Sequence, residues 1–274
     1  MVFSGSLGNK PEGGVKRAAL GGILLRMSKK PLAMNDSLLA SEKYCQDLVR
    51  QRDEDRWLAV QYSSADAQGG LIALYAMHQE IRRIPSAVSE PPLGEIRLQW
   101  WREALDEIIA GEKVRAHPVV EYAASLKLVT EENRALIEQA IDARAHLLYG
   151  EPFYSAEAML NWFDQSEGFL AAARLATGHD FSEEKLAHLI RAESAFVLAN
   201  GGEGVAPDLV EEALVLAMPS IEAAASILKN LSAEQSTPHL HLSLVKSRTG
   251  KKSGPLTPVT TRLRLFTTML TGRF

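Results

Sequence analysis

The sequence contains very little cysteine and has no long, uninterrupted hydrophobic run. Its single cysteine, Cys45, excludes a disulfide framework and a cysteine-rich zinc site, and favours a reducing compartment. No apolar stretch approaches the ~20 residues that a membrane-spanning helix needs. The apolar segment from Ala18 to Leu25 follows basic residues, but it is short and no small-residue cleavage site follows it, so a signal peptide is not expected. These absences predict a cytoplasmic protein.

Acidic and basic residues are distributed unevenly along the 274 residues, although the net charge is only −4. Residues 1–36 carry six basic and two acidic side chains, and residues 246–274 carry seven basic side chains and no acid. The section between them has 17 basic and 32 acidic residues, a net charge of −15. Such an acidic body argues against nucleic-acid binding. The basic end favours contact with an anionic membrane or an acidic partner, which predicts a peripheral position on the inner face of a membrane.

The hydrophobic pattern predicts an all-α chain with one domain. Residues 1–36 are rich in glycine, lack helical periodicity, and are expected to form a disordered extension ahead of a helical domain at 37–245 and a basic tail or helix at 246–274. A helical stripe runs from Leu38 to Tyr62, and no stretch alternates as a strand would. Proline and glycine mark the breaks, for example at Pro85. Further helices are predicted near 66–84, 93–111, 119–128, 131–149, 155–177, 182–199 and 208–231.

Several short motifs occur in a characteristic order. They are Leu74-Tyr-Ala-Met77, Trp101-Arg-Glu-Ala-Leu105, Gly111 followed by His117-Pro-Val119, and Glu167-Gly-Phe-Leu170. Over roughly residues 41–235 the chain resembles the squalene/phytoene synthase family. That resemblance implies a single isoprenoid-synthase-type helical bundle around a central apolar cavity for prenyl chains. It also implies a Mg²⁺-dependent, head-to-head condensation of two farnesyl or geranylgeranyl diphosphates.

A more specific likeness lies in Glu80-Ile81 and in the block from Ser89 to Arg102, which reads Ser-Glu-Pro-Pro-Leu-Gly-Glu-Ile-Arg-Leu-Gln-Trp-Trp-Arg. These residues resemble the branch of the family that contains a mitochondrial respiratory complex I assembly factor. This resemblance implies a role in the assembly of a membrane complex. It points to Ser89–Arg102 as a protein-binding surface, with partner-binding candidates Glu90, Glu95, Arg97, Gln99 and Arg102.

The aspartate motifs of the catalytic family are missing. Two carboxylates four residues apart on a helix face the same way, and such pairs hold the Mg²⁺ ions that bind the diphosphate. Alignment on Tyr75 places Arg82 and Ser86 at the first pair of positions, and Pro85 between them should end the helix. In the second region, 192–204, Glu193 and Glu203 are ten residues apart. We therefore expect no metal, no cofactor and a non-catalytic protein, with a prenyl lipid as an occupant of the cavity.

Catalysis remains an alternative hypothesis, with Asp53, Asp55 and Glu80 as Mg²⁺ ligands of an active prenyltransferase. The family's diphosphate-contacting segment aligns near Asp53–Arg56, where unneutralised carboxylates would repel a diphosphate by ~4 kcal/mol for each close contact. Glu103, Asp106 and Glu107 could form a surrogate clamp, or a solvated face on which Arg102 pairs with Asp106. His239 and His241 have no third ligand nearby in the sequence, which favours structural or surface roles.

The basic tail has two open interpretations. Leu263, Phe266 and Leu270 can share one helix face, with arginines nearby, so the segment could dock at a membrane interface. The alternative is a basic helix packed on the acidic body. The membrane-contact candidates are Lys251, Lys252, Arg262, Arg264 and Phe266.

Overall fold

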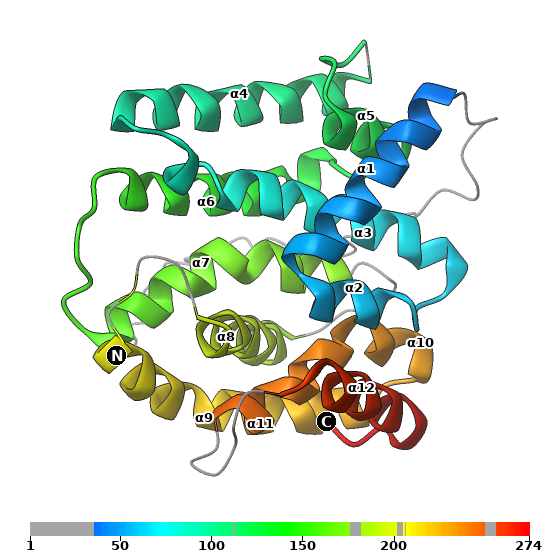
Figure 1. Ribbon diagram of the computed structural model, residues 1–274, viewed down its shortest axis with the longest axis vertical. Coiled ribbons are helices and arrows are strands. Elements are labelled where there is room, and N and C mark those ends of the chain that lie inside the picture. The colour runs from blue at the N-terminus through cyan, green and yellow to red at the C-terminus, as the bar shows by residue number, and fades with distance from the viewer. Residues whose placement is uncertain (1–35, 112, 176–181, 202–204, 206, 250–255) are drawn as a thin grey trace, which may run out of the picture.

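The computed structural model describes residues 36–111, 113–175, 182–201, 205, 207–249 and 256–274, and every regular element in these ranges is a helix (Figure 1). The predicted extension at 1–36, apart from its last residue, and the candidates Lys251 and Lys252 lie outside the described residues. The elements are α1 (Asp36–Arg52), α2 (Glu54–Val60), α3 (Ala65–Arg82), η1 (Pro85–Ala87), α4 (Pro91–Ala110), α5 (Pro118–Ser125), α6 (Glu131–Leu148), α7 (Ala156–Leu175), α8 (Glu183–Ala199), α9 (Pro207–Lys229), α10 (Ala233–Ser236), η2 (Thr237–Leu244), α11 (Val245–Thr249) and α12 (Pro258–Thr271).

The helix boundaries follow the local chemistry of the sequence. The stripe from Leu38 to Tyr62 breaks at Asp53, whose side chain caps α2 by accepting a hydrogen bond from the backbone N–H of Arg56. As predicted, α3 ends at Arg82, before Pro85 begins η1. Gly111 ends α4 with φ +69°, a left-handed conformation that glycine adopts without strain.

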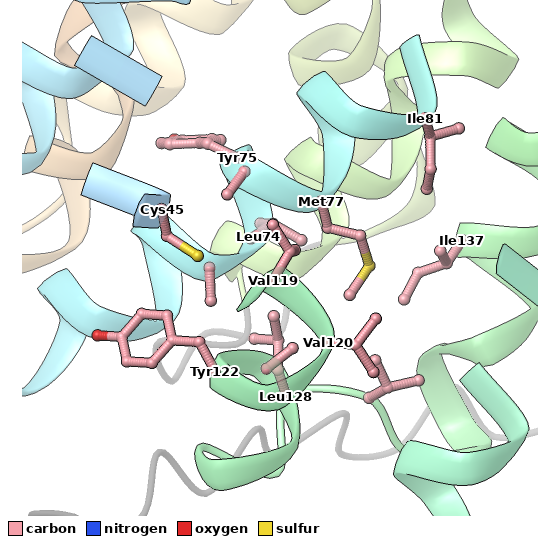
Figure 2. Packing of buried hydrophobic residues seen from close by; sticks show 14 of the residues in the cluster. Cys45, Leu74, Tyr75, Met77, Ile81, Val119, Val120, Tyr122, Leu128 and Ile137 are labelled. Atoms are coloured by element: carbon pink, nitrogen blue, oxygen red, sulfur yellow. The ribbon is translucent and has the colours of Figure 1, made fainter. Parts of the chain in front are cut away.

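The apolar core consists of two clusters of buried side chains. In the first cluster, Leu74 and Met77 of α3 face Val119 and Val120 of α5, with Cys45 of α1 beside them (Figure 2). The second cluster is formed mainly by α7, α8, α9 and η2, and α8 is seen almost end-on between α7 and α9 in Figure 1. None of the described helices is long and apolar enough to cross a membrane.

Acidic residues on α4 are paired with arginines of neighbouring elements. Arg115 contacts both Glu103 and Glu107, and Arg134 of α6 contacts Asp106. These contacts fit a solvated, ion-paired face. The predicted pairing of Arg102 with Asp106 is wrong, because Arg102 reaches across to Asp142 on α6 instead.

Candidate functional site

Charged and polar side chains from six elements meet in the interior of the bundle. We call this group the buried charge network. Its members are Asp53 and Arg56 of α2 and its cap, His78 of α3, Arg144 of α6, Glu167 of α7, Glu193 of α8 and His241 of η2.

Arg56 is the centre of the network and is fully buried. Its Nη1 lies 2.7 Å from Asp53 Oδ2, and its Nη2 lies 2.9 Å from Glu193 Oε2 and 3.5 Å from Glu167 Oε2. The guanidinium also lies over the ring of Phe196, 5.1 Å from its centroid. Burial by itself would lower the pKa of Arg56, but the carboxylates of Asp53, Glu193 and Glu167 outweigh it and raise the pKa. Arg56 is therefore a permanent cation shared by three acids.

Glu167 is the second point at which contacts converge. Arg144 Nη2 lies 3.0 Å from its Oε1, and His78 Nε2 lies 3.0 Å from its Oε2. Burial by itself would raise the pKa of Glu167, but His78, Arg56 and Arg144 together hold it well below its usual range. The pKa of His78 is lowered, because burial disfavours the imidazolium more than Glu167 favours it. The carboxylate of Glu167 therefore stays ionised, stabilised by His78, Arg56 and Arg144.

Glu193 is bound from two sides. It accepts from Arg56 on one side, and its Oε1 lies 2.9 Å from His241 Nε2 on the other. Sequence reasoning assigned Glu193 no partner and gave His241 only a structural or surface role. A usable signal was present, because Glu193 lies on the apolar face of α8 next to Ala192 and one turn from Leu189. A lone charge at such a position requires a partner of opposite charge.

The buried charge network places ionised side chains in the interior of the bundle. The family resemblance implies a central apolar cavity, and the space between α2, α3, α6, α7 and α8 also contains these ion pairs. The physical reason is that the carboxylates and guanidiniums satisfy one another, which allows polar groups to be buried.

The side chains present do not fit a Mg²⁺ site. Mg²⁺ needs carboxylate oxygens with uncompensated negative charge, and it keeps several water ligands. Here Arg56 lies among the carboxylates of Asp53, Glu167 and Glu193, and its guanidinium supplies the positive charge. In the part of the chain that the structure describes, no group of three or more His, Cys, Asp or Glu residues is placed to hold a metal.

A pocket of about 340 Å³ opens beside the network, and it brings together only some of the residues of the catalytic alternative. Asp53 and Asp55 both line it, as does Arg82. Glu80 is not among the residues that line this pocket, and its carboxylate contacts Tyr44 and Arg83. The full lining is Arg52, Asp53, Glu54, Asp55, Arg56, Arg82, Phe196, Val197 and Asn200.

The acids around this pocket are paired with arginines from the C-terminal segment as well as from α2. Arg248 of α11 contacts Asp55 at 2.6 Å, and Arg262 of α12 contacts Glu54 at 2.8 Å. The run Asp53–Asp55 therefore binds one arginine for each carboxylate. The repulsion of a diphosphate that the bare sequence suggests is reduced by these partners.

The partner-binding candidates occupy the exposed side of α4 and its cap. Glu90 precedes the helix, and Glu95, Arg97 and Gln99 are exposed on it. Arg102 is half-buried at Asp142, and Glu95 accepts a hydrogen bond from Tyr149. Two large apolar side chains, Leu93 and Ile96, are exposed among these polar residues. These residues lie on or directly before α4, which is the outermost helix at one end of the bundle (Figure 1).

Of the membrane-contact candidates that the structure describes, two contact the helical domain and one faces solvent. Arg262 is paired with Glu54, and Arg264 Nε donates to the carbonyl of Ser243, so both contact the body. Phe266 is exposed. The interpretation as a helix packed on the acidic body therefore describes one face of α12, which packs on η2 and α2.

Comparison with known protein families and solved structures identifies the family to which this chain belongs. The model of the squalene/phytoene synthase family matches residues 49–199, which is more than half of the chain. The chain belongs to the squalene/phytoene synthase family. A crystal structure of a dehydrosqualene synthase in complex with ligand superposes with a TM-score of 0.59 over 84% of this chain and 95% of that one, at 11% sequence identity. This likeness confirms the predicted isoprenoid-synthase-type fold.

The curated proteins that are similar in sequence are named as assembly factors and not as synthases. The mouse (Mus musculus) protein "NADH dehydrogenase (ubiquinone) complex I, assembly factor 6" is 25% identical over 138 residues, which is 50% of this chain and 41% of that protein. The human (Homo sapiens) protein of the same name is 22% identical over 130 residues, 47% of this chain and 39% of that protein. The matches thus cover about two fifths of the relatives' own length.

Proposed function

We propose that this squalene/phytoene synthase-family protein is non-catalytic and acts in the assembly of a membrane complex, namely respiratory complex I. The observation that carries the proposal is the position of Arg56 among three carboxylates, the buried Glu167 and Glu193 and the half-buried Asp53. A prenyl synthase uses such carboxylates to hold Mg²⁺ against a diphosphate leaving group, and a guanidinium in their midst removes the charge that would bind the metal.

The same network gives the fold a role that does not require catalysis. Breaking buried ion pairs leaves uncompensated charges, so the network holds α2, α3, α6, α7, α8 and η2 in one arrangement. A rigid bundle of this kind can present a binding surface. In the proposal, the exposed side of α4 around Glu95, Ile96 and Arg97 contacts a protein of the complex during its assembly.

The names of the curated relatives support the assembly role, since they are complex I assembly factors by name. In this proposal the protein works in the cytoplasm, at the inner face of the membrane that contains the complex. A prenyl lipid bound in the bundle is part of the hypothesis as a ligand rather than as a substrate.

Deletion of the gene tests the proposal. We expect the deletion strain to lose assembled complex I on native gels while its isoprenoid content is unchanged, and the wild-type gene to restore assembly. A chain carrying Ile96→Glu and Arg97→Glu should fold but fail to restore it, whereas Val215→Ser and Leu216→Ser on α9 should restore it fully. Normal complex I together with a missing isoprenoid product would overturn the proposal in favour of a prenyltransferase.

A further inference from the structure

The C-terminal helix α12 buries one large apolar side chain and two threonines, and it exposes four large apolar side chains. Thr261, Leu265 and Thr268 are its buried residues. The apolar residues that face solvent, with their exposed fractions, are Val259 (73%), Leu263 (59%), Phe266 (44%) and Leu270 (62%). A helix that only packs on a protein core has the opposite arrangement, with its apolar face inward.

The four exposed side chains form one stripe, which we call the outer stripe of α12. At 100° per residue, positions 259, 263, 266 and 270 fall within about 60° of each other, and the buried positions lie on the opposite side. Water contact with a contiguous apolar patch is unfavourable, and patches of this kind mark interaction sites. The outer stripe therefore has the geometry of a binding surface.

The charge around the outer stripe indicates what binds there. Residues 246–274 contain seven basic side chains and no acid, in contrast to the net charge of −15 between 37 and 245. Lys246 and Arg273 are exposed, and Arg262 lies next to the stripe, with a side chain that remains more than half exposed although it contacts Glu54. An apolar stripe with cations beside it is typical of helices that lie in the interface of an anionic membrane.

We propose that the outer stripe of α12 is a membrane-binding surface that inserts into the boundary between headgroups and acyl chains of a bilayer containing anionic lipid. Val259, Leu263, Phe266 and Leu270 enter the apolar region, while Arg262 and Arg273 stay at the phosphate level. The 14-residue helix lies flat in the interface, because it is too short to span the bilayer.

A second copy of this chain fits the outer stripe less well. A stable protein interface buries about 1,600 Å² in total and draws on roughly 20–30 residues from each side. The stripe offers four side chains from a single helix, whereas a membrane needs only a narrow apolar face and nearby cations.

Vesicle flotation of the full chain tests the proposal. We expect wild-type protein to float with vesicles of phosphatidylcholine and phosphatidylglycerol, and much less with phosphatidylcholine alone. Leu263→Ser with Phe266→Ser should weaken binding at least about tenfold, because two inserted apolar side chains are lost. The matched control is Val215→Ser with Leu216→Ser, an exposed apolar pair on α9, which should float like wild type.

Three results would overturn the proposal. One is wild-type protein that does not float with anionic vesicles, and another is equal flotation of the wild type and the α12 variant. The third is a wild-type dimer that the α12 variant converts to monomer without any flotation, which would assign the stripe to contact between copies. Because both pairs of substitutions are at exposed positions, circular dichroism should be unchanged.

This inference goes beyond the proposed function and can fail separately from it. If the protein binds anionic vesicles through α12 but its deletion leaves complex I assembled, the membrane surface stands and the assembly role falls. If complex I is lost on deletion but the protein does not bind anionic vesicles, the assembly role stands and the membrane-binding surface is ruled out.

Discussion

Arg56 Nη2 and Glu193 Oε2 lie 2.9 Å apart in the interior of the bundle, although the two residues are 137 positions apart in the sequence. Both side chains are fully buried, and each has a further charged or titratable neighbour, Glu167 for Arg56 and His241 for Glu193. This pair joins α2 to α8 across the interior of the bundle.

Replacement of Arg56 by methionine should destabilise the protein strongly. The change leaves the carboxylates of Glu167 and Glu193 buried without their shared cation, and breaking one side of a buried ion pair costs about 3–5 kcal/mol. Urea unfolding, followed by circular dichroism, measures the free energy of unfolding. The control is Arg262→Met, which removes an exposed ion pair with Glu54 and should cost under about 1 kcal/mol. Equal losses of unfolding free energy in the two variants would show that the buried ion pairs of Arg56 stabilise the protein no more than an exposed pair does.

Stability should fall as the pH is lowered below neutrality. The pKa of His78 is lowered in the folded protein, so the unfolded chain binds a proton first, and stability is lost as the pH drops below the unfolded value of about 6.5. The pKa of Glu167 is also lowered, so a second loss begins below about 4.5, its unfolded value.

The pH prediction is measured by urea unfolding between about pH 7 and about pH 5, the window of the histidine effect. His78→Gln should flatten the dependence in this window. His117 also has a pKa lowered by burial and contributes in the same direction, so His117→Gln is the comparison variant. A wild-type stability that rises as the pH falls across this window would contradict the assignment.

The contact between α4 and α6 should depend on the absence of a side chain at Gly94. A Cβ atom there would lie 2.1 Å from Leu148 Cδ2, so Gly94→Val forces Leu148 to move and should destabilise the protein by about 1–3 kcal/mol. Shortening the neighbour with Leu148→Ala in the same chain should recover part of that loss relative to Leu148→Ala alone. A purely additive effect of the two changes in a double-mutant cycle would rule out this contact as the cause.

The helices were predictable from the sequence because apolar spacing and breakers act locally. The end of α3 before Pro85 and the left-handed stop at Gly111 need no knowledge of distant residues. The absence of a carboxylate pair around Arg82 was also readable, since both positions lie on one helix.

The buried charge network was not predictable in the same way. Its contacts join Arg56 to Glu193 and Arg144 to Glu167 across the folded bundle, and the sequence does not say which charged residue meets which. The sequence alone places Arg56 in an acidic run that aligns with a diphosphate-contacting segment, because its partners on α7 and α8 come close only when the helices pack. The position of Glu193 on an apolar helix face was the one local sign of a buried partner.

The central claim is that arginines, rather than divalent cations, neutralise the buried carboxylates, and an assay of prenyl transfer tests it most directly. Purified full-length protein is incubated with Mg²⁺ and farnesyl or geranylgeranyl diphosphate, with a dehydrosqualene synthase as the positive control. We predict no pyrophosphate release above the background without protein. Mg²⁺-dependent release that disappears in a folded Asp53→Ala variant would contradict the account.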